Sequence, residues 1–108
     1  MKMYIFIKDS VPDEFAPVVA AHASLSCYLR YKNDKEMKKW LATSFKKVVC
    51  VITHEEFQRL KFNWVSNAKF NVTTESSLND EEVAITFCPR ETYPEAFKMF
   101  KLWKPKNN

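Results

Sequence analysis

One segment of this chain leaves little choice of fold: the five consecutive apolar residues Val48 to Ile52. Four of the five are β-branched, and a run without polar alternation indicates a strand that is buried on both faces. Such a strand needs other elements packed above and below its sheet. With 108 residues, the chain has room for one domain, residues 1–108, and one hydrophobic core. The run therefore predicts an α/β domain with a central buried strand.

The patterns around this strand predict the remaining elements. Further strands are expected at residues 4–8, 69–74 and 82–87, and helices at residues 15–31, 34–43, 54–66 and from Pro94 onward. Helical crossovers between the early strands require parallel neighbours, and the short loop between the last two strands suits an antiparallel pair. The expected fold is a three-layer α/β/α domain with a mixed four-stranded sheet. Lys101 to Trp103 fit either a terminal strand or an extended tail.

The first and third helices carry start signals and apolar stripes. In the first, Asp13 is the expected N-cap, and Val18, Leu25 and Leu29 recur at helical spacing with His22 on the same stripe, so this face is expected to pack inward. Thr53-His54-Glu55-Glu56 matches a capping box and starts the third helix, which is expected to bury Phe57, Leu60 and Val65.

The composition excludes several classes of site. The chain has no glycine, so the glycine-rich phosphate-binding loops cannot form. Cys27, Cys50 and Cys88 lack metal-ligand spacing and lie in apolar contexts, so we expect reduced, buried thiols, no metal and no cofactor. No segment has the length of apolar sequence that a membrane span or signal peptide requires, and we expect a cytoplasmic protein without membrane contact.

The charge of +4 favours polyanions such as RNA. The basic side chains that we consider for RNA contact lie on the second helix, before the central strand and near the end of the chain: Lys32, Lys35, Lys38, Lys39, Lys46, Lys47, Lys98, Lys101, Lys104 and Lys106. The alternative for the helical group is a solvated face with pairs such as Asp34–Lys38. Trp40, Trp64 and Trp103 are either base-stacking or core residues.

The order of several short motifs resembles the type 2 peptidyl-tRNA hydrolases, over residues 3–104. These motifs are Lys8-Asp9 at a strand end, Ala20-Ala21-His22-Ala23, Trp40 before Lys47-Val48-Val49, Glu55-Glu56-Phe57 with Leu60, Ala84 to Pro89, and Phe100 to Lys104. Residues 22–41 are most similar to a divergent animal branch, the peptidyl-tRNA hydrolase domain-containing proteins. The resemblance implies the family's fold and its activity without metal or cofactor, the cleavage of the ester that joins a nascent peptide to tRNA.

Of the family's active-site residues, His22 matches directly. The family's lysine-containing loop corresponds to Val11 to Pro17, which has no lysine, and its Asp-Ala-Gly-x-Thr loop falls around Asn71 to Glu75, where asparagine replaces aspartate. The resemblance implies that Lys8, Asp9 and Glu75 gather near His22. The expected cleft is formed by residues 8–14, His22 and residues 71–77, at the carboxyl ends of strands.

The chemistry of this group leaves alternatives open. Ester hydrolysis needs an activated water and a stabilised oxyanion, and histidine titrates near neutral pH, so His22 is a candidate base. The alternative for His22 is a structural role on a helix that packs against the sheet. Asp13 and Glu14 are either an acid/base pair or first-turn residues favoured by the helix dipole. The leading hypothesis is hydrolysis of peptidyl-tRNA or a related aminoacyl ester. Alternatives are a degenerate relative that binds RNA or a protein, and a hydrolase of another small ester or amide; the protein is a monomer or a homodimer.

Overall fold

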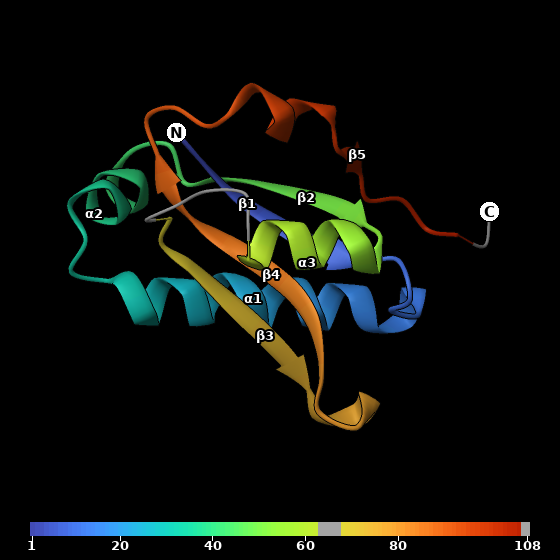
Figure 1. Cartoon of the computed structure of the whole chain (residues 1–108). Helices are drawn as coiled ribbons and strands as arrows, with labels where there is room; N and C mark the ends of the chain where they lie inside the picture. The colour runs from blue at the N-terminus through green and yellow to red at the C-terminus, as the bar shows by residue number, and fades with distance from the viewer. Residues whose placement is uncertain (63–67, 107–108) are drawn as a thin grey trace.

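The computed structural model describes residues 1–62 and 68–106, in which helices cover both faces of a mixed sheet (Figure 1). The strands are β1 (Lys2–Lys8), β2 (Lys46–Ile52), β3 (Phe70–Glu75), β4 (Glu81–Arg90) and β5 (Lys101–Leu102). The α-helices are α1 (Ala16–Tyr31), α2 (Lys35–Ala42) and α3 (His54–Phe62), with short 3₁₀ helices at Asp13–Phe15, Ser76–Leu78 and Glu95–Met99. The mixed α/β prediction is confirmed.

The strands lie in the order β3-β4-β1-β2-β5. β1 pairs parallel with β2, with Phe6 opposite Cys50, and antiparallel with β4, with Phe6 opposite Ile85. β3 and β4 form an antiparallel hairpin. The expectation of four strands is wrong, because Lys101–Leu102 adds a fifth strand that pairs with Cys50 and Val51. Two bridged residues carry too little pattern to be separated from a tail by sequence alone.

The sheet divides the buried side chains into two layers, as the period-two alternation of β1 requires. Ile5 and Ile7 face the layer beneath α1 and α2, which also contains Val19, Ala23, Met37 and Trp40. Tyr4 and Phe6 face the layer beneath α3, together with Phe57, Leu60 and Phe97. The strand predicted at residues 47–52 therefore has covered faces on both sides, because Val49 packs against the first layer and Cys50 lies in the second.

The predicted inner face of α1 is wrong. Val18, Leu25 and Leu29 are 46%, 58% and 56% exposed. The buried residues of α1 are the smaller Ala16, Val19, Ala23 and Cys27. Small side chains let the helix approach the sheet closely, and this close contact places the larger apolar residues outside.

Several boundaries also differ from expectation. Asp13 is not the N-cap of α1, which begins at Ala16 after the 3₁₀ turn. The Asp13 carboxylate instead accepts a hydrogen bond from the Lys106 backbone N–H at 2.7 Å. After Pro94 the chain forms a 3₁₀ helix. Phe57 and Leu60 are buried as predicted, whereas Val65 and Trp64 lie outside the described residues. None of the described helices has the length and apolar character needed to cross a membrane.

Candidate active site

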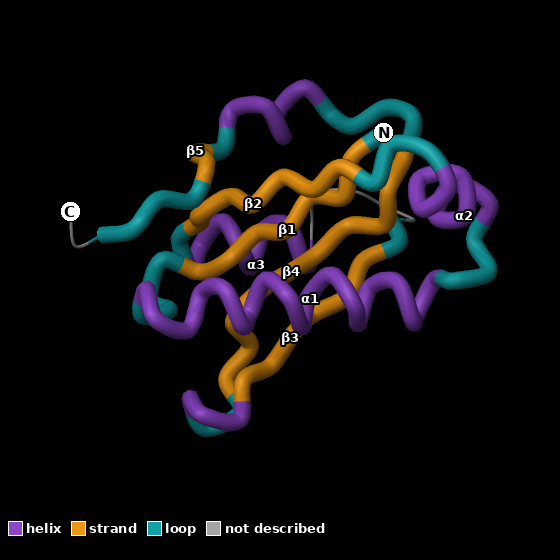
Figure 2. Tube along the Cα trace, turned by 180° about the vertical axis from the view of Figure 1, so that it is seen from behind, coloured by secondary structure: helices purple, strands orange, loops and turns teal. Residues whose placement is uncertain are grey.

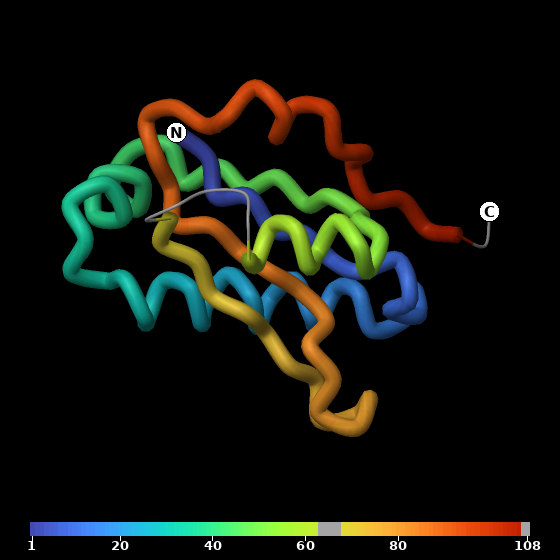
Figure 3. The backbone as a smooth tube through the Cα atoms, in the orientation of Figure 1, coloured from blue at the N-terminus to red at the C-terminus, as the bar shows by residue number. Residues whose placement is uncertain are grey.

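A groove of about 430 Å³ runs between α1 and the β3–β4 hairpin. His22 and Ser26 line it from α1, one helical turn apart, and His22 is exposed. The opposite wall consists of β3 and the turn that follows it: Asn71, Val72, Thr73, Thr74, Glu75, Ser76 and Asp80. β3 crosses in front of α1 in Figure 1 and in the tube of Figure 3, and the two elements are in contact. The groove is polar and open to solvent.

The register of the hairpin determines which β3 side chains face α1. Asn71 pairs with Thr86 and Thr73 pairs with Ala84, and Ala84 belongs to the layer beneath α1. Because alternate residues share a face, Asn71 and Thr73 point toward the helix that carries His22. The buried Thr73 Oγ1 makes no hydrogen bond within the described residues. A buried hydroxyl without a partner costs about 1–3 kcal/mol, so it favours a ligand or water that bonds to it.

Glu75 ends β3 and is 7% exposed. Its Oε1 accepts a hydrogen bond from the Ser77 backbone N–H at 3.2 Å, and its carbonyl accepts one from Asp80 N–H at 3.0 Å. Asn79 and Asp80 both have φ of 57°, a left-handed conformation that asparagine and aspartate tolerate well. This turn therefore holds two carboxylates, those of Glu75 and Asp80, on the groove.

The groove is acidic. Glu75 and Asp80 supply two carboxylates, and no lysine or arginine lines it among residues 1–62 and 68–106. Negative charge in the groove attracts a positively charged ligand group. The same charge repels a phosphate.

The structure separates the four predicted site residues into two pairs. His22 and Glu75 line the groove between α1 and β3. Lys8 lies on the opposite face of the sheet, where its Nζ is 4.3 Å from the centre of the Phe57 ring on α3. Asp9 follows directly and lines a different cavity. The predicted cleft had three segments: residues 8–14, His22 and residues 71–77. Only the last two form the groove, because Lys8 points to the α3 layer.

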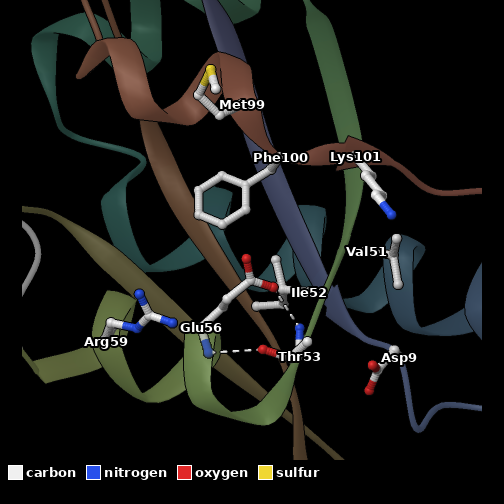
Figure 4. A pocket seen from close by; sticks show the side chains of 9 residues that line it. All are labelled: Asp9, Val51, Ile52, Thr53, Glu56, Arg59, Met99, Phe100 and Lys101. Carbon is white, nitrogen blue, oxygen red and sulfur yellow. Dashed lines mark hydrogen bonds between the residues drawn. The ribbon is translucent and has the colours of Figure 1, made fainter.

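The cavity next to Asp9 has a volume of about 520 Å³ (Figure 4). It lies at the carboxyl ends of β1 and β2, between the start of α3 and the Met99–Lys101 segment. Glu56 closes the predicted capping box: its carboxylate accepts from Thr53 N–H at 2.8 Å, and its own N–H donates to Thr53 Oγ1 at 3.1 Å. Arg59 and Lys101 add two cations. Arg59 lies in no recognisable sequence motif, although a cavity at this strand edge is common in α/β proteins.

The predicted RNA-contacting residues divide by environment. Lys32, Lys35 and Lys38 are exposed, whereas Lys39 pairs with Glu91 at 2.7 Å. Trp40 is a core residue, 2% exposed, whose Nε1–H donates to the Lys46 carbonyl. Trp103 is half-buried and its backbone N–H bonds to the Val49 carbonyl, and Trp64 lies outside the described residues. Of the two tryptophans that the structure describes, Trp40 lies in the core and Trp103 packs, partly buried, against the layer beneath α1.

The remaining candidate groups have structural surroundings. His54 is in the first turn of α3, as predicted, with its Nε2 3.2 Å from Gln58 Nε2. Asp13 forms an ion pair with Lys106 at 3.1 Å. Cys27, Cys50 and Cys88 are free thiols buried in the core, which confirms their predicted packing. Within the described parts of the chain, no cluster of three or more His, Cys, Asp or Glu side chains has the arrangement to hold a metal ion.

Comparison with models of known protein families and with curated proteins finds no match for this chain. The assignment of a function therefore depends on the groove itself.

Proposed function

We propose that the chain is a divergent relative of the type 2 peptidyl-tRNA hydrolases that hydrolyses the ester of peptidyl-tRNA or of a related aminoacyl compound. The observation that carries this proposal is the groove in which an exposed histidine, His22, faces a wall of amide, hydroxyl and carboxylate groups. Ester hydrolysis needs a base for water and hydrogen-bond donors for the oxyanion, and both types of group line this groove. The proposal also places the protein in the cytoplasm, where such esters form during translation.

Each group has a definite role in this proposal. The His22 imidazole takes a proton from a water molecule as the water oxygen attacks the ester carbonyl carbon. The Asn71 amide and the Ser26 hydroxyl donate to the developing oxyanion. The bond between the carbonyl carbon and the ribose oxygen then breaks, and the imidazolium returns the proton to that oxygen. Glu75 and Asp80 stabilise the imidazolium that forms during the reaction.

The charge of the groove favours one class of ester. Glu75 and Asp80 attract the protonated α-amino group of an aminoacyl ester, whereas the amide of a peptidyl ester carries no such charge. The phosphates of a tRNA must then contact the protein elsewhere, and the exposed Lys35 and Lys38 are available. We therefore expect aminoacyl esters to be cleaved faster than N-acylated ones.

The direct test compares cleavage of aminoacyl-tRNA and N-acetyl-aminoacyl-tRNA by wild type, His22→Ala and His54→Ala. His54 is the matched control, because it is the other histidine of the chain and lies on α3, away from the groove. Loss of a general base is expected to lower kcat/KM about 10²–10⁴-fold. Equal rates for wild type and His22→Ala would reject the groove as the active site, and cleavage of small esters alone would reject tRNA as the substrate.

A second candidate function is binding without cleavage, with RNA as the ligand. It is favoured by a specific observation: Lys8 faces α3 and no lysine or arginine of the described chain lines the His22 groove. Under this alternative, the wild type cleaves none of the esters but binds tRNA with an affinity that falls steeply with salt. Lys35→Glu and Lys38→Glu would then weaken binding, and His22→Ala would not.

A further inference from the structure

The outward face of α1 is unusually apolar for a solvent-exposed helix. Figure 2 views the molecule from the side on which α1 lies in front of the sheet, and no other segment is drawn over the helix. Val18, Leu25 and Leu29 are exposed on it. The opposite face already packs on the sheet through Val19, Ala23 and Cys27. The helix therefore has two apolar faces, of which the fold of one chain uses one.

The outward residues follow the spacing of a helix that packs on another helix. Positions 18, 21, 25, 28 and 32 are separated alternately by three and four residues, which is the heptad spacing of a helix–helix seam. Position 14, four residues before Val18, lies in the 3₁₀ turn that leads into α1. From first to last, these residues are Glu14, Val18, Ala21, Leu25, Tyr28 and Lys32. The four central residues are apolar or aromatic. The two terminal residues are an acid and a base.

This stripe is complementary to itself when turned end for end. Its positions are symmetric about residue 23, so two antiparallel copies place Val18 against Tyr28, and Ala21 against Leu25. The same arrangement places Glu14 of each copy against Lys32 of the other. Both charged side chains are exposed and neither forms an ion pair within the described residues. Antiparallel helices also bring opposite dipole ends together.

A groove next to the stripe extends the apolar surface. It has a volume of about 200 Å³ and lies between α1 and the α2–β2 segment, lined by Ser24, Leu25, Tyr28, Trp40, Leu41, Phe45 and Lys47. Phe45 is 52% exposed. Because Tyr28 belongs to both the stripe and the groove, the residue opposite Tyr28 in the antiparallel arrangement, a second Val18, has a recess to enter.

We propose that α1 is the contact surface of a homodimer in which two copies pack antiparallel along Glu14 to Lys32. α1 is about 24 Å long, so the contact is limited to one helix and the adjoining groove. The dimer is therefore expected to dissociate at micromolar concentrations. This inference does not depend on the proposed activity, because His22 and Ser26 lie toward β3, beside the stripe.

Sedimentation velocity of the full chain, from low micromolar to submillimolar concentration, tests the proposal. Wild type is expected to change from monomer to dimer over this range. Leu25→Glu places a charge at the centre of the seam and is expected to raise the dissociation constant at least about tenfold, while Leu102→Glu, an exposed leucine on β5, leaves it unchanged. Circular dichroism confirms that both variants remain folded. A wild type that is monomeric at every concentration, or a Leu25→Glu variant that dimerises as wild type does, would overturn the proposal.

A charge exchange tests the orientation of the two helices. Glu14→Lys and Lys32→Glu each place like charges together at both ends of the seam, so each is expected to weaken the dimer several-fold. The double variant restores opposite charges and is expected to recover the wild-type dissociation constant. A parallel dimer places Glu14 against Glu14 and Lys32 against Lys32, so each single exchange keeps like charges together and leaves the dissociation constant unchanged. Single variants that dimerise as wild type does would therefore reject the antiparallel arrangement.

Discussion

Asp34 joins three parts of the molecule through one carboxylate. Its Oδ1 accepts a hydrogen bond from Met37 N–H at 3.0 Å and caps α2, and its Oδ2 pairs with Lys69, just before β3. Cys88 on β4 lies 3.7 Å from Oδ1. Burial by itself raises the pKa of Asp34, whose side chain is 10% exposed, but the hydrogen bonds from Lys69 and Met37 and the charge of Lys69 outweigh it and lower the pKa below its ordinary value.

The lowered pKa of Asp34 predicts how stability depends on pH. A carboxyl with a lower pKa in the folded state stabilises the fold above its unfolded pKa, and this contribution is lost as pH falls through the folded pKa. Asp34→Asn keeps a capping side chain and removes the charge, so it is expected to lower the free energy of unfolding by about 1 kcal/mol near neutral pH. Urea denaturation at a series of pH values should show this difference shrinking in acid, below about pH 4.

The exposed Lys39–Glu91 ion pair provides a matched control for the Asp34–Lys69 pair. Both side chains are largely exposed, and water and salt screen such a pair. Glu91→Gln is therefore expected to change stability much less than Asp34→Asn at neutral pH. If Asp34→Asn lost as much stability at pH 3 as at pH 7, the cause would be the shape of the cap and not the charge.

At the scale of the element, α1 shows that close packing can outweigh hydrophobicity. Ala23 is completely buried between the helix and the sheet, whereas the larger Leu25 is mostly exposed. Ala23→Leu adds three carbons where the helix and the sheet are already closely packed, so it is expected to lower the free energy of unfolding by about 1–3 kcal/mol. Leu25→Ser is expected to change it by less than about 0.5 kcal/mol. Denaturation at low protein concentration, where the chain is monomeric, measures both; the opposite order would mean that the assigned inner face is wrong.

The sequence predicted the elements of this fold better than their contacts. The run at Val48 to Ile52 and the capping box at Thr53 are local signals, and the structure has β2 and α3 there. The orientation of α1 depends on how closely the helix approaches the sheet, which is a tertiary property. Phe45 was equally unpredictable: it has φ of 55° where glycine is favoured, and its ring packs against Trp40.

The part of the candidate site that depends on the order of the elements, and on the alternation of side chains along strands, could be predicted from the sequence. His22 and the residues after Asn71 share a groove because α1 crosses β3, as the expected order of elements allowed. Lys8 differs because its side chain direction follows from the alternation of β1, in which Tyr4 and Phe6 face α3, and Lys8 shares their face. Applied to β1, the same alternation separates Lys8 from the layer that contains Ile5 and Ile7. Asp9, one residue later, follows the turn into the Figure 4 cavity.

At the scale of the whole molecule, two apolar layers share one sheet, so we expect the opening of one layer to expose the other. β1 is the centre of this arrangement, because it pairs with β2 and β4 and contributes Ile5 to one layer and Phe6 to the other. The three cysteine thiols are divided between the two layers. Cys27 and Cys88 belong to the layer beneath α1, and Cys50 belongs to the layer beneath α3.

Burial raises the pKa of each thiol, of Cys27 and Cys88 to about 12 and of Cys50 to about 11. The thiolate is the reactive form, so the folded protein is expected to resist alkylation by iodoacetamide near neutral pH. If the two layers open together, labelling with enough iodoacetamide to react before the fold recloses should give molecules with no label or three labels and few with one or two, as detected by mass spectrometry. Phe6→Ala removes a ring from the central strand, is expected to cost about 3–5 kcal/mol, and should accelerate the labelling of all three thiols by the same factor. Faster labelling of Cys50 alone would contradict this cooperativity, and would show that the edge formed by β5, which pairs with Cys50, opens by itself.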